Sequence, residues 1–387
     1  MAEDICVIVP TIREPEAVAA YIENARTRGF DLDRLHVVFV TESFCDTDVM
    51  ERILAENGVA GRIFDGPARN DWYEERDIGE FAHLIPAESH AQTSFGLLYM
   101  WAGDFEYGVF LDDDTRPHEE VDFFGQHLAN LNHGGPIEIV DSDTGWVNPL
   151  YQRDGDLYPR GFPYGAMGET TTTETASVGD VVASQGLWTG IPDLDAVRIL
   201  QDGDLNGQAQ TLTTRTDFDR TFAVESGSYT TVCSMNLAFR REVIPAFYQF
   251  PMDDNPWEVG RFDDIWSGVL LKRAADAYRD TILTGFPLCD HQKAPRSTFD
   301  DLASEAPALE LNEHLWRIVD DVDPGQLPAD RADAYAVVFE AVGHRLASGE
   351  FDQWRNGDFL PYVGEYMLDW LDCLAALAPR ERPMVSD

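Results

Sequence analysis

The chain has 387 residues, and 44% of them are apolar, which is enough for a sizeable core in one large or two ordinary domains. Its 70 acidic residues outnumber 28 basic ones and give a formal net charge of −42, which excludes the basic surface that nucleic-acid binding rewards. No apolar run approaches the roughly 20 residues that span a membrane, so we expect no transmembrane segment.

The N-terminal part of the chain alternates between apolar runs and helical patterns. Residues 5–9 and 35–40 are apolar runs typical of buried strands, and residues 14–28 between them repeat apolar side chains at helical spacing. A separation of about 30 residues between the two runs is typical of a βαβ unit. Further elements are expected at residues 50–57 (helix), 62–64 (strand) and 91–101 (helix). The pattern predicts an α/β fold with a largely parallel, doubly wound sheet.

Three consecutive carboxylates follow the next predicted strand. Residues 105–111 are aromatic and branched, and Asp112, Asp113 and Asp114 come directly after them. Ligands bind outside the carboxyl ends of strands in open α/β sheets. Carboxylates there can hold a divalent cation, and the cation can hold a diphosphate. An acidic turn without a ligand is the alternative in a chain this rich in aspartate.

The second half of the chain first loses and then regains regular patterning. Residues 141–230 are rich in Gly, Thr, Asp and Pro, which indicates loops and short strands over a site. Residues 263–279 predict a helix with Asp263 and Asp264 in its first turn, where carboxylates suit the helix dipole. Beyond residue 300 the pattern is helical, which predicts a C-terminal segment for packing or for forming a homo-oligomer.

Seven segments, in order, resemble the reversibly glycosylated polypeptides, the UDP-arabinopyranose mutase family. They cover residues 8–13 (IVPTIR), 110–114 (FLDDD), 160–164 (RGFPY), 184–188 with 191–196, 233–239, 260–266, and 284–287 with 291–294. The resemblance implies a GT-A-like nucleotide-sugar fold. It makes residues 1–300 the catalytic domain, with residues 141–230 as its sugar or acceptor region, and residues 301–387 a helical extension.

The resemblance also implies a metal and diphosphate site. Asp112 and Asp114 would bind Mn²⁺ or Mg²⁺ and, through the cation, the diphosphate of a UDP-sugar. His291 matches a position from which related folds offer a histidine to the metal or diphosphate; a hydrogen-bonded surface histidine is the alternative. Asp113 would bind the nucleotide-sugar or only shape the turn. Lys293 is one of two lysines in the chain, and its compact ammonium suits a phosphate oxygen.

The nucleotide and the sugar would meet other side chains. Pro10, Thr11 and Arg13 end the first predicted strand, where this fold class receives the uridine; a simple turn is the alternative. Trp188 would stack on a sugar face, with core packing as an equally weighted alternative.

Arg160 matches the arginine that the family glycosylates reversibly. A protonated guanidinium is a poor nucleophile, so it needs a carboxylate to align it or to accept its proton, and Asp263 and Asp264 are the expected partners. Capping of a helix N-terminus is the alternative role of this pair. The family's second arginine, seven residues later, is Met167 here, which puts mutase activity in doubt. Three hypotheses follow: a UDP-arabinopyranose mutase, a glycosyltransferase acting on a glycan, lipid or protein acceptor, and a non-catalytic partner subunit.

The cysteines and the first residues predict the compartment. The five cysteines form no CxxC pair, which indicates neither a zinc site nor a disulfide framework. The start of the chain is acidic where a signal peptide is basic. We therefore expect a reducing, cytoplasmic setting.

The charge predicts a halophilic protein whose stability depends on salt. Acidic residues spread over ordered segments repel one another in dilute buffer, and this repulsion is screened at molar salt, where the Debye length is about 3 Å. We expect the melting temperature to rise steeply from low to molar KCl in a thermal melt followed by circular dichroism. A melting temperature independent of KCl would show an ordinary acidic protein.

Overall fold

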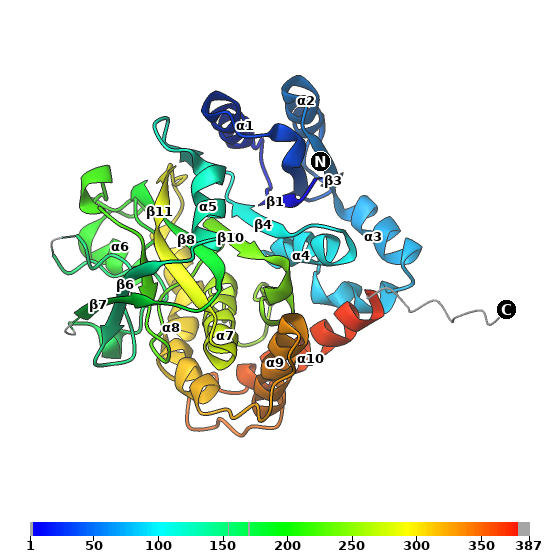
Figure 1. Cartoon of the computed structure of the whole chain (residues 1–387). Helices are drawn as coiled ribbons and strands as arrows, with labels where there is room; N and C mark the ends of the chain where they lie inside the picture. Colours follow the sequence, from blue (N-terminus) through cyan, green and yellow to red (C-terminus); the bar gives the residue numbers. More distant parts are fainter. Residues whose placement is uncertain (1–2, 154, 169–170, 378–387) are drawn as a thin grey trace.

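The computed structural model describes residues 3–153, 155–168 and 171–377 (Figure 1). In the N-terminal part the elements are β1 (Ile5–Pro10), α1 (Glu16–Arg28), β2 (Leu35–Val40), α2 (Asp48–Asn57), β3 (Ala60–Phe64), α3 (Gly66–Glu75), α4 (Gln92–Ala102), β4 (Tyr107–Leu111), β5 (Thr115–Pro117) and α5 (Phe123–Leu131). Next come β6 (Pro136–Ser142), β7 (Thr171–Ser177), β8 (Val181–Gly190), α6 (Ala196–Asp202), β9 (Phe222–Val224) and β10 (Asn236–Arg240). The last are α7 (Asp263–Tyr278), β11 (Thr281–His291), α8 (Thr298–Asp320), α9 (Arg331–Ala347) and α10 (Phe359–Leu377). Short 3-10 turns are η1 (Leu32–Arg34), η2 (Gly79–Leu84), η3 (Tyr164–Ala166), η4 (Arg215–Asp217) and η5 (Arg241–Ala246).

One sheet runs through the described part of the chain, in the order β3-β2-β1-β4-β10-β8-β11-β9-β6-β7, with β5 beside β11. Strands β3, β2, β1 and β4 are parallel, and their pairing follows the predicted βαβ units. β10 runs antiparallel to both β4 and β8, and β11 is parallel to β8, so the second half of the sheet is mixed. The predicted α/β fold is confirmed, whereas the prediction of a largely parallel sheet is correct only for β3, β2, β1 and β4 and wrong for the mixed second half.

The strand directions bring distant segments to one edge of the sheet. β8 and β11 run in the same direction as β1 and β4 because the antiparallel β10 separates the two pairs. Their carboxyl ends, at Pro10, Leu111, Gly190 and His291, therefore lie at the same edge. Ligands of open α/β sheets bind at such an edge.

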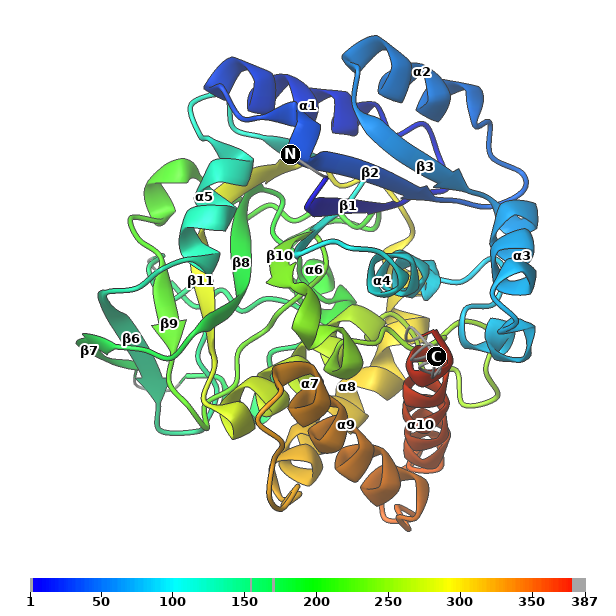
Figure 2. The same ribbon diagram turned by 45° about the vertical axis from the view of Figure 1, so that its right-hand side comes forward.

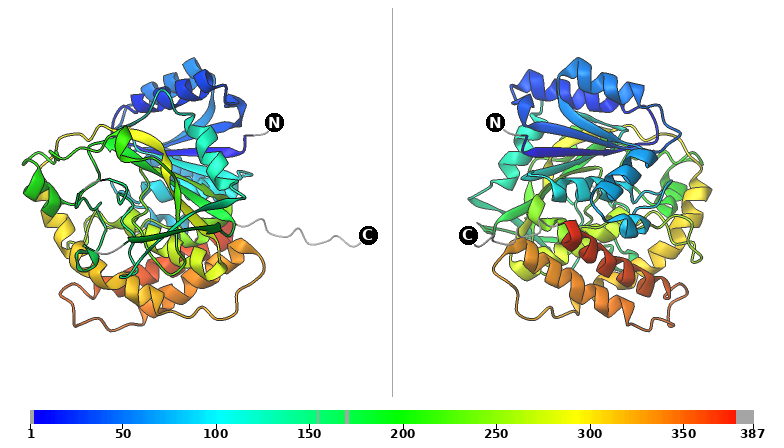
Figure 3. Two further views of the ribbon diagram at one scale, coloured as in Figure 1. Left: turned by 60° about the vertical axis from the view of Figure 1, so that its left-hand side comes forward. Right: turned by 90° about the vertical axis from the view of Figure 1, so that its right-hand side faces the viewer.

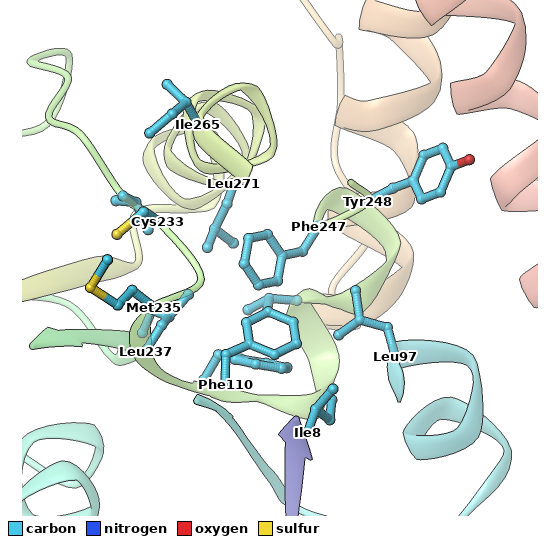
Figure 4. Packing of buried hydrophobic residues seen from close by; sticks show 14 of the residues in the cluster. Ile8, Leu97, Phe110, Cys233, Met235, Leu237, Phe247, Tyr248, Ile265 and Leu271 are labelled. Atoms are coloured by element: carbon cyan, nitrogen blue, oxygen red, sulfur yellow. The ribbon is translucent and has the colours of Figure 1, made fainter. Parts of the chain in front are cut away.

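Helices cover both faces of the sheet. Figures 2 and 3 show α1 and α2 on one face of β1, β2 and β3, and α4 on the other, where it contacts β1 and β2. Strands β1 and β2 are almost continuous apolar runs, interrupted by His36 in β2, because both faces of the sheet are covered. Figure 4 shows the core where α4 and α7 pack near the sheet and where Phe110 of β4 packs against Phe247, with ring centroids 5.5 Å apart. This packing fixes the end of β4 and hence the start of the aspartate triplet.

The C-terminal helices pack on the body of the molecule. The predicted domain boundary at residue 300 lies inside α8. The N-cap of this helix is Ser297, whose side chain accepts a hydrogen bond from the backbone N–H of Asp300. Trp370 of α10 is fully buried and stacks on Tyr248, with ring centroids 4.7 Å apart. Packing is thus one role of the predicted helical segment; residues 378–387 of that segment lie outside the described residues. Among the described helices, none combines the length and the apolar character needed to cross a membrane.

Candidate functional site

The aspartate triplet lies at the shared edge, next to the end of β1. Thr11 donates a hydrogen bond from its hydroxyl to Asp113, 2.7 Å away. Arg13 donates from Nε to both Asp113 oxygens, at 3.0 and 3.1 Å, and its Nη2 lies 3.5 Å from Asp114. The structure therefore brings Thr11 and Arg13 to the triplet, and it pairs Asp113 with a cation of the chain itself.

Asp112 carries the strongest sign of crowded negative charge. Burial raises the pKa of its carboxyl well above the usual range, and Asp114, Asp113, Asp264 and Asp193 add to this effect. Asp264 and Asp193 belong to segments far away in the sequence, so acids from three segments of the chain act on Asp112. A site of this kind favours a cation.

His291, the last residue of β11, faces the triplet across β5. β5 pairs antiparallel with β11 and sets Thr115 opposite His291. The ring donates from Nδ1 to the carbonyl of Ile191, 2.6 Å away, and its Nε2 lies 3.8 Å from Asp114. Burial lowers the pKa of His291, which favours the neutral ring with a free lone pair on Nε2. A backbone carbonyl that fixes the ring in this way is typical of metal-ligating histidines.

These donors fit a divalent cation. Among the described residues, no three His, Cys, Asp or Glu side chains stand close enough together to hold a metal ion unaided. Mg²⁺ and Mn²⁺ are commonly held by one or two carboxylates together with substrate phosphates and water. Asp112, Asp114 and His291 offer hard oxygens and one imidazole, which suits a cation shared with a diphosphate.

Lys293 lies just beyond His291 and is 8% exposed. Within the described residues, no acceptor is within hydrogen-bond or ion-pair distance of its Nζ, and burial lowers the pKa of the ammonium. The other lysine, Lys272, is also buried but pairs with Asp276 on the same helix. Scarcity alone would single out both lysines, whereas a buried cation without a partner at the site is particular to Lys293.

Arg160 forms ion pairs with two carboxylates, those of Asp193 and Asp264. Its Nε donates to Asp193 at 3.1 Å, and its Nη2 lies 3.0 Å from the same carboxylate. Its Nη1 and Nη2 donate to the two oxygens of Asp264, both at 3.0 Å, and Nη1 also donates to the carbonyl of Arg261. Burial alone would lower the pKa of Arg160, but Asp193 and Asp264 outweigh it and raise the pKa well above its usual value.

The partners of Arg160 respond to it in turn. Burial opposes ionisation of Asp193, yet the Arg160 guanidinium outweighs it and lowers the pKa of the carboxyl to about 2. Asp264, in the first turn of α7, is one of the two partners that the sequence predicts, and the other, Asp263, makes no hydrogen bond or ion pair with Arg160 among the contacts of the described residues. Asp193 lies in a segment that carried the family resemblance, but its sequence, Ile-Pro-Asp, has no local feature that separates a site residue from a turn.

The arginine segment is held by its neighbours. Gly161 has φ +87°, and a Cβ there would lie 2.3 Å from Ile265 of α7, so only glycine lets Arg160 approach that helix. Asn312 of α8 donates to the carbonyl of Gly161 at 2.8 Å. Glu305 of α8 accepts from Arg261 at 2.8 Å and from the backbone N–H of Ala196 at 2.6 Å. Helix α8 therefore supports the site through Asn312 and Glu305. The helical pattern of the sequence predicts the helix but not this role.

Trp188 and Pro10, which the sequence analysis assigned to nucleotide-sugar binding, make no contact with the charged groups of the site among the contacts of the described residues. Trp188 of β8 is 1% exposed and packs in the core, so the core-packing alternative holds and stacking on a sugar face is wrong for this conformation. The strand pattern could not decide this because every residue from Val181 to Thr189 is buried. Pro10 ends β1 at the edge of the site.

Asp263, the other acid of the pair, is 6% exposed, and within the described residues its carboxyl accepts no hydrogen bond. Burial, followed by the charge of Asp264, raises its pKa to about 6. The folded state thus holds this proton more tightly than the unfolded state, so its contribution to stability is full below pH ~4 and is lost as the pH rises to about 6.

Asp263→Asn is therefore expected to stabilise the protein at pH 7 by up to about 3 kcal/mol, a gain that vanishes below pH ~4. Denaturant unfolding of the variant and the native protein between pH 4 and 8 measures this difference. Asp372→Asn, an exposed change on α10, should leave stability unchanged at every pH. An Asp263→Asn difference that does not grow with pH would contradict the buried, raised-pKa state.

Known proteins share sequence similarity with this chain. A probable UDP-arabinopyranose mutase 1 from Pisum sativum is 28% identical over 324 residues, covering 81% of this chain and 77% of the pea protein. UDP-arabinopyranose mutase 2 from Arabidopsis thaliana is 25% identical over 388 residues, covering 98% and 93% of the two chains.

Solved structures are more distant. A mannosyltransferase from Pyrobaculum calidifontis, in complex with GDP-mannose and Mn²⁺, is 14% identical with a TM-score of 0.43, covering 96% of this chain and 86% of that one. Glucosyl-3-phosphoglycerate synthase from Mycobacterium tuberculosis, in complex with Mn²⁺ and UDP-glucose, is 13% identical with a TM-score of 0.39, covering 80% and 79%. A family model covers almost the whole chain. The model for reversibly glycosylated polypeptides matches residues 2–375. The chain belongs to the reversibly glycosylated polypeptide family.

Proposed function

We propose that the protein is a metal-dependent UDP-sugar enzyme that interconverts the pyranose and furanose forms of UDP-arabinose or a similar sugar. The observation that carries the proposal is that the aspartate triplet and the ion pair of Arg160 with Asp264 influence each other. The charge of Asp264, which pairs with Arg160, reaches Asp112 of the triplet. A diphosphate held at the triplet would therefore present its sugar toward Arg160. The names of the plant relatives support this substrate class.

The roles follow from the contacts. Asp112, Asp114 and His291 would hold Mn²⁺ or Mg²⁺ together with the diphosphate, and Lys293 would donate to a phosphate oxygen. When bound, the cation neutralises the charge that develops on the departing UDP. Thr11 and Arg13 lie on the side of β1, and Arg13, half-exposed at 49% of its side chain, would exchange Asp113 for the phosphates.

Reversible self-glycosylation would use Arg160. A guanidinium nitrogen would form a bond to the anomeric carbon, the bond from that carbon to the diphosphate oxygen would break, and UDP would leave with the electron pair. The N–H proton would pass to Asp264, which already accepts a hydrogen bond from both Nη atoms. Every guanidinium nitrogen faces an acceptor in this conformation, so one carboxylate contact must open before the reaction.

A positive charge lies beside Met167 even though the family's second arginine is absent at this position. The guanidinium of Arg198, from α6, contacts the sulfur of Met167 and lies over the rings of Tyr158 and Tyr164, 5.4 and 5.5 Å from their centroids. A cation from another segment thus stands beside position 167. This contact favours a catalytic role over a non-catalytic partner subunit.

One assay distinguishes the mutase hypothesis from the glycosyltransferase hypothesis. We expect the protein, in molar KCl with Mn²⁺ and no acceptor, to convert UDP-arabinopyranose into UDP-arabinofuranose, detected by chromatography. Release of UDP only when an acceptor is added would replace the mutase by a glycosyltransferase. The buried Asp263 carboxyl, with its pKa of about 6, is the observation that favours this second candidate, because a raised pKa suits a general base.

The covalent step has its own test. Radiolabel from UDP-arabinose is expected to stay on the native protein and on Arg355→Lys, an exposed arginine of matched chemistry. It should be absent from Arg160→Lys. Equal labelling of Arg160→Lys would remove Arg160 as the attachment site.

A further inference from the structure

Asp193 is the least exposed ion-pair partner of Arg160. It lies between β8 and α6 and is 6% exposed. Its carboxylate accepts from Nε of Arg160 at 3.1 Å, and its backbone carbonyl accepts from the backbone N–H of Arg160 at 2.8 Å. Both the chain and the side chain of Arg160 are therefore tied to one residue.

The two carboxylates take different edges of the guanidinium. Asp193 holds the edge formed by Nε and Nη2, and Asp264 holds the edge formed by Nη1 and Nη2. A planar fork held at two edges has one orientation, whereas a fork held at one edge can tilt. Loss of Asp193 would leave Asp264 as the sole carboxylate that orients Arg160.

Lys293 and His291, on the other side of the site, add to the effect of Arg160 in lowering the pKa of the Asp193 carboxyl. It is not itself a partner for a phosphate, because two negative groups repel.

We propose that Asp193 is a positioning residue that fixes the orientation of Arg160 against Asp264. The inference rests on the proposed function for its kinetic consequence, and on the contacts above for the orientation of Arg160. A misplaced reacting group costs turnover far more than it costs binding of the nucleotide.

Asp193→Asn is expected to lower kcat by about 10- to 100-fold, because small misplacements near the reacting atoms have effects of this size. Its affinity for UDP with Mn²⁺, measured by calorimetry, should be unchanged or tighter, because one negative charge near the diphosphate is gone. Asp193→Glu restores the charge and should recover part of kcat. A kcat within about twofold of the native value, or a parallel weakening of UDP binding, would overturn the proposal.

A second readout is independent of turnover. Arg160 should resist phenylglyoxal, which modifies unprotonated guanidinium groups, in the native protein and react faster in Asp193→Asn, as mapped by mass spectrometry. The matched control is Asp280→Asn, since Asp280 is 8% exposed, pairs with Arg331 at 2.9 Å and precedes the opposite end of β11. It should lose stability but keep kcat and the protection of Arg160.

The two proposals fail in different ways. Native protein that makes no UDP-arabinofuranose would remove the proposed function, and the reaction of Arg160 with phenylglyoxal would then test the role of Asp193 by itself. Equal reactivity of Arg160 in the native protein and in Asp193→Asn would show that Asp193 does not hold it.

Discussion

Asp112→Asn is expected to weaken Mn²⁺-dependent binding of UDP by about a hundredfold or more, and to remove turnover. Loss of a residue that merely supports a metal ligand costs roughly 10- to 100-fold, and a direct ligand should cost at least as much. Calorimetric titration of UDP in molar KCl, with Mn²⁺ and after chelation, measures the loss. The same change removes one of three adjacent carboxylates, so the metal-free variant should melt at a higher temperature than the native protein.

Weaker UDP binding together with a higher melting temperature distinguishes this result from misfolding, which would lower both. Asp372→Asn makes the same chemical change on the exposed side of α10 and should leave both quantities as they are. Undiminished UDP binding by Asp112→Asn, or equal native binding with and without a divalent cation, would remove the triplet from the metal site.

Arg160→Ala is expected to lower the free energy of unfolding by about 3–5 kcal/mol, because it leaves two buried carboxylates without their counter-charge. Asp193 and Asp264 have side-chain exposures of only 8% and 12%, so water cannot replace the guanidinium fully. Arg160→Lys should recover part of this stability, because it returns one positive charge without the planar fork. Turnover should be lost in both variants.

Denaturant unfolding at molar KCl measures the stability change, and Arg355→Ala, at an exposed position, should change it by less than about 0.5 kcal/mol. A stability of Arg160→Ala equal to that of the native protein would mean that the two carboxylates are protonated or solvated once Arg160 is absent. The paired role of the arginine would then be wrong.

The sequence predicts the parts of the site that strand ends determine. An apolar strand followed by acids places Asp112, Asp113 and Asp114 without knowledge of the rest of the chain, and the first-turn acids of α7 place Asp264. The carboxyl ends of β4, β8 and β11 share one edge because the antiparallel β10 lies between β4 and β8, and the pairing of β10 with β4 joins residues more than a hundred positions apart.

Other residues escape sequence reasoning for physical reasons. Asp193, Glu305 and Asn312 act through partners far away in the chain, so neither spacing nor periodicity marks them. Trp188 could not be assigned from its strand because both faces of β8 are buried, and the alternation that separates inside from outside is absent.

The position of Mn²⁺ in crystals grown with UDP tests the central claim most directly. An anomalous-scattering peak is expected between the carboxylates of Asp112 and Asp114 and Nε2 of His291, with the diphosphate on the cation and within reach of Lys293. Bound UDP with no peak at these side chains, or with the peak elsewhere, would contradict the account.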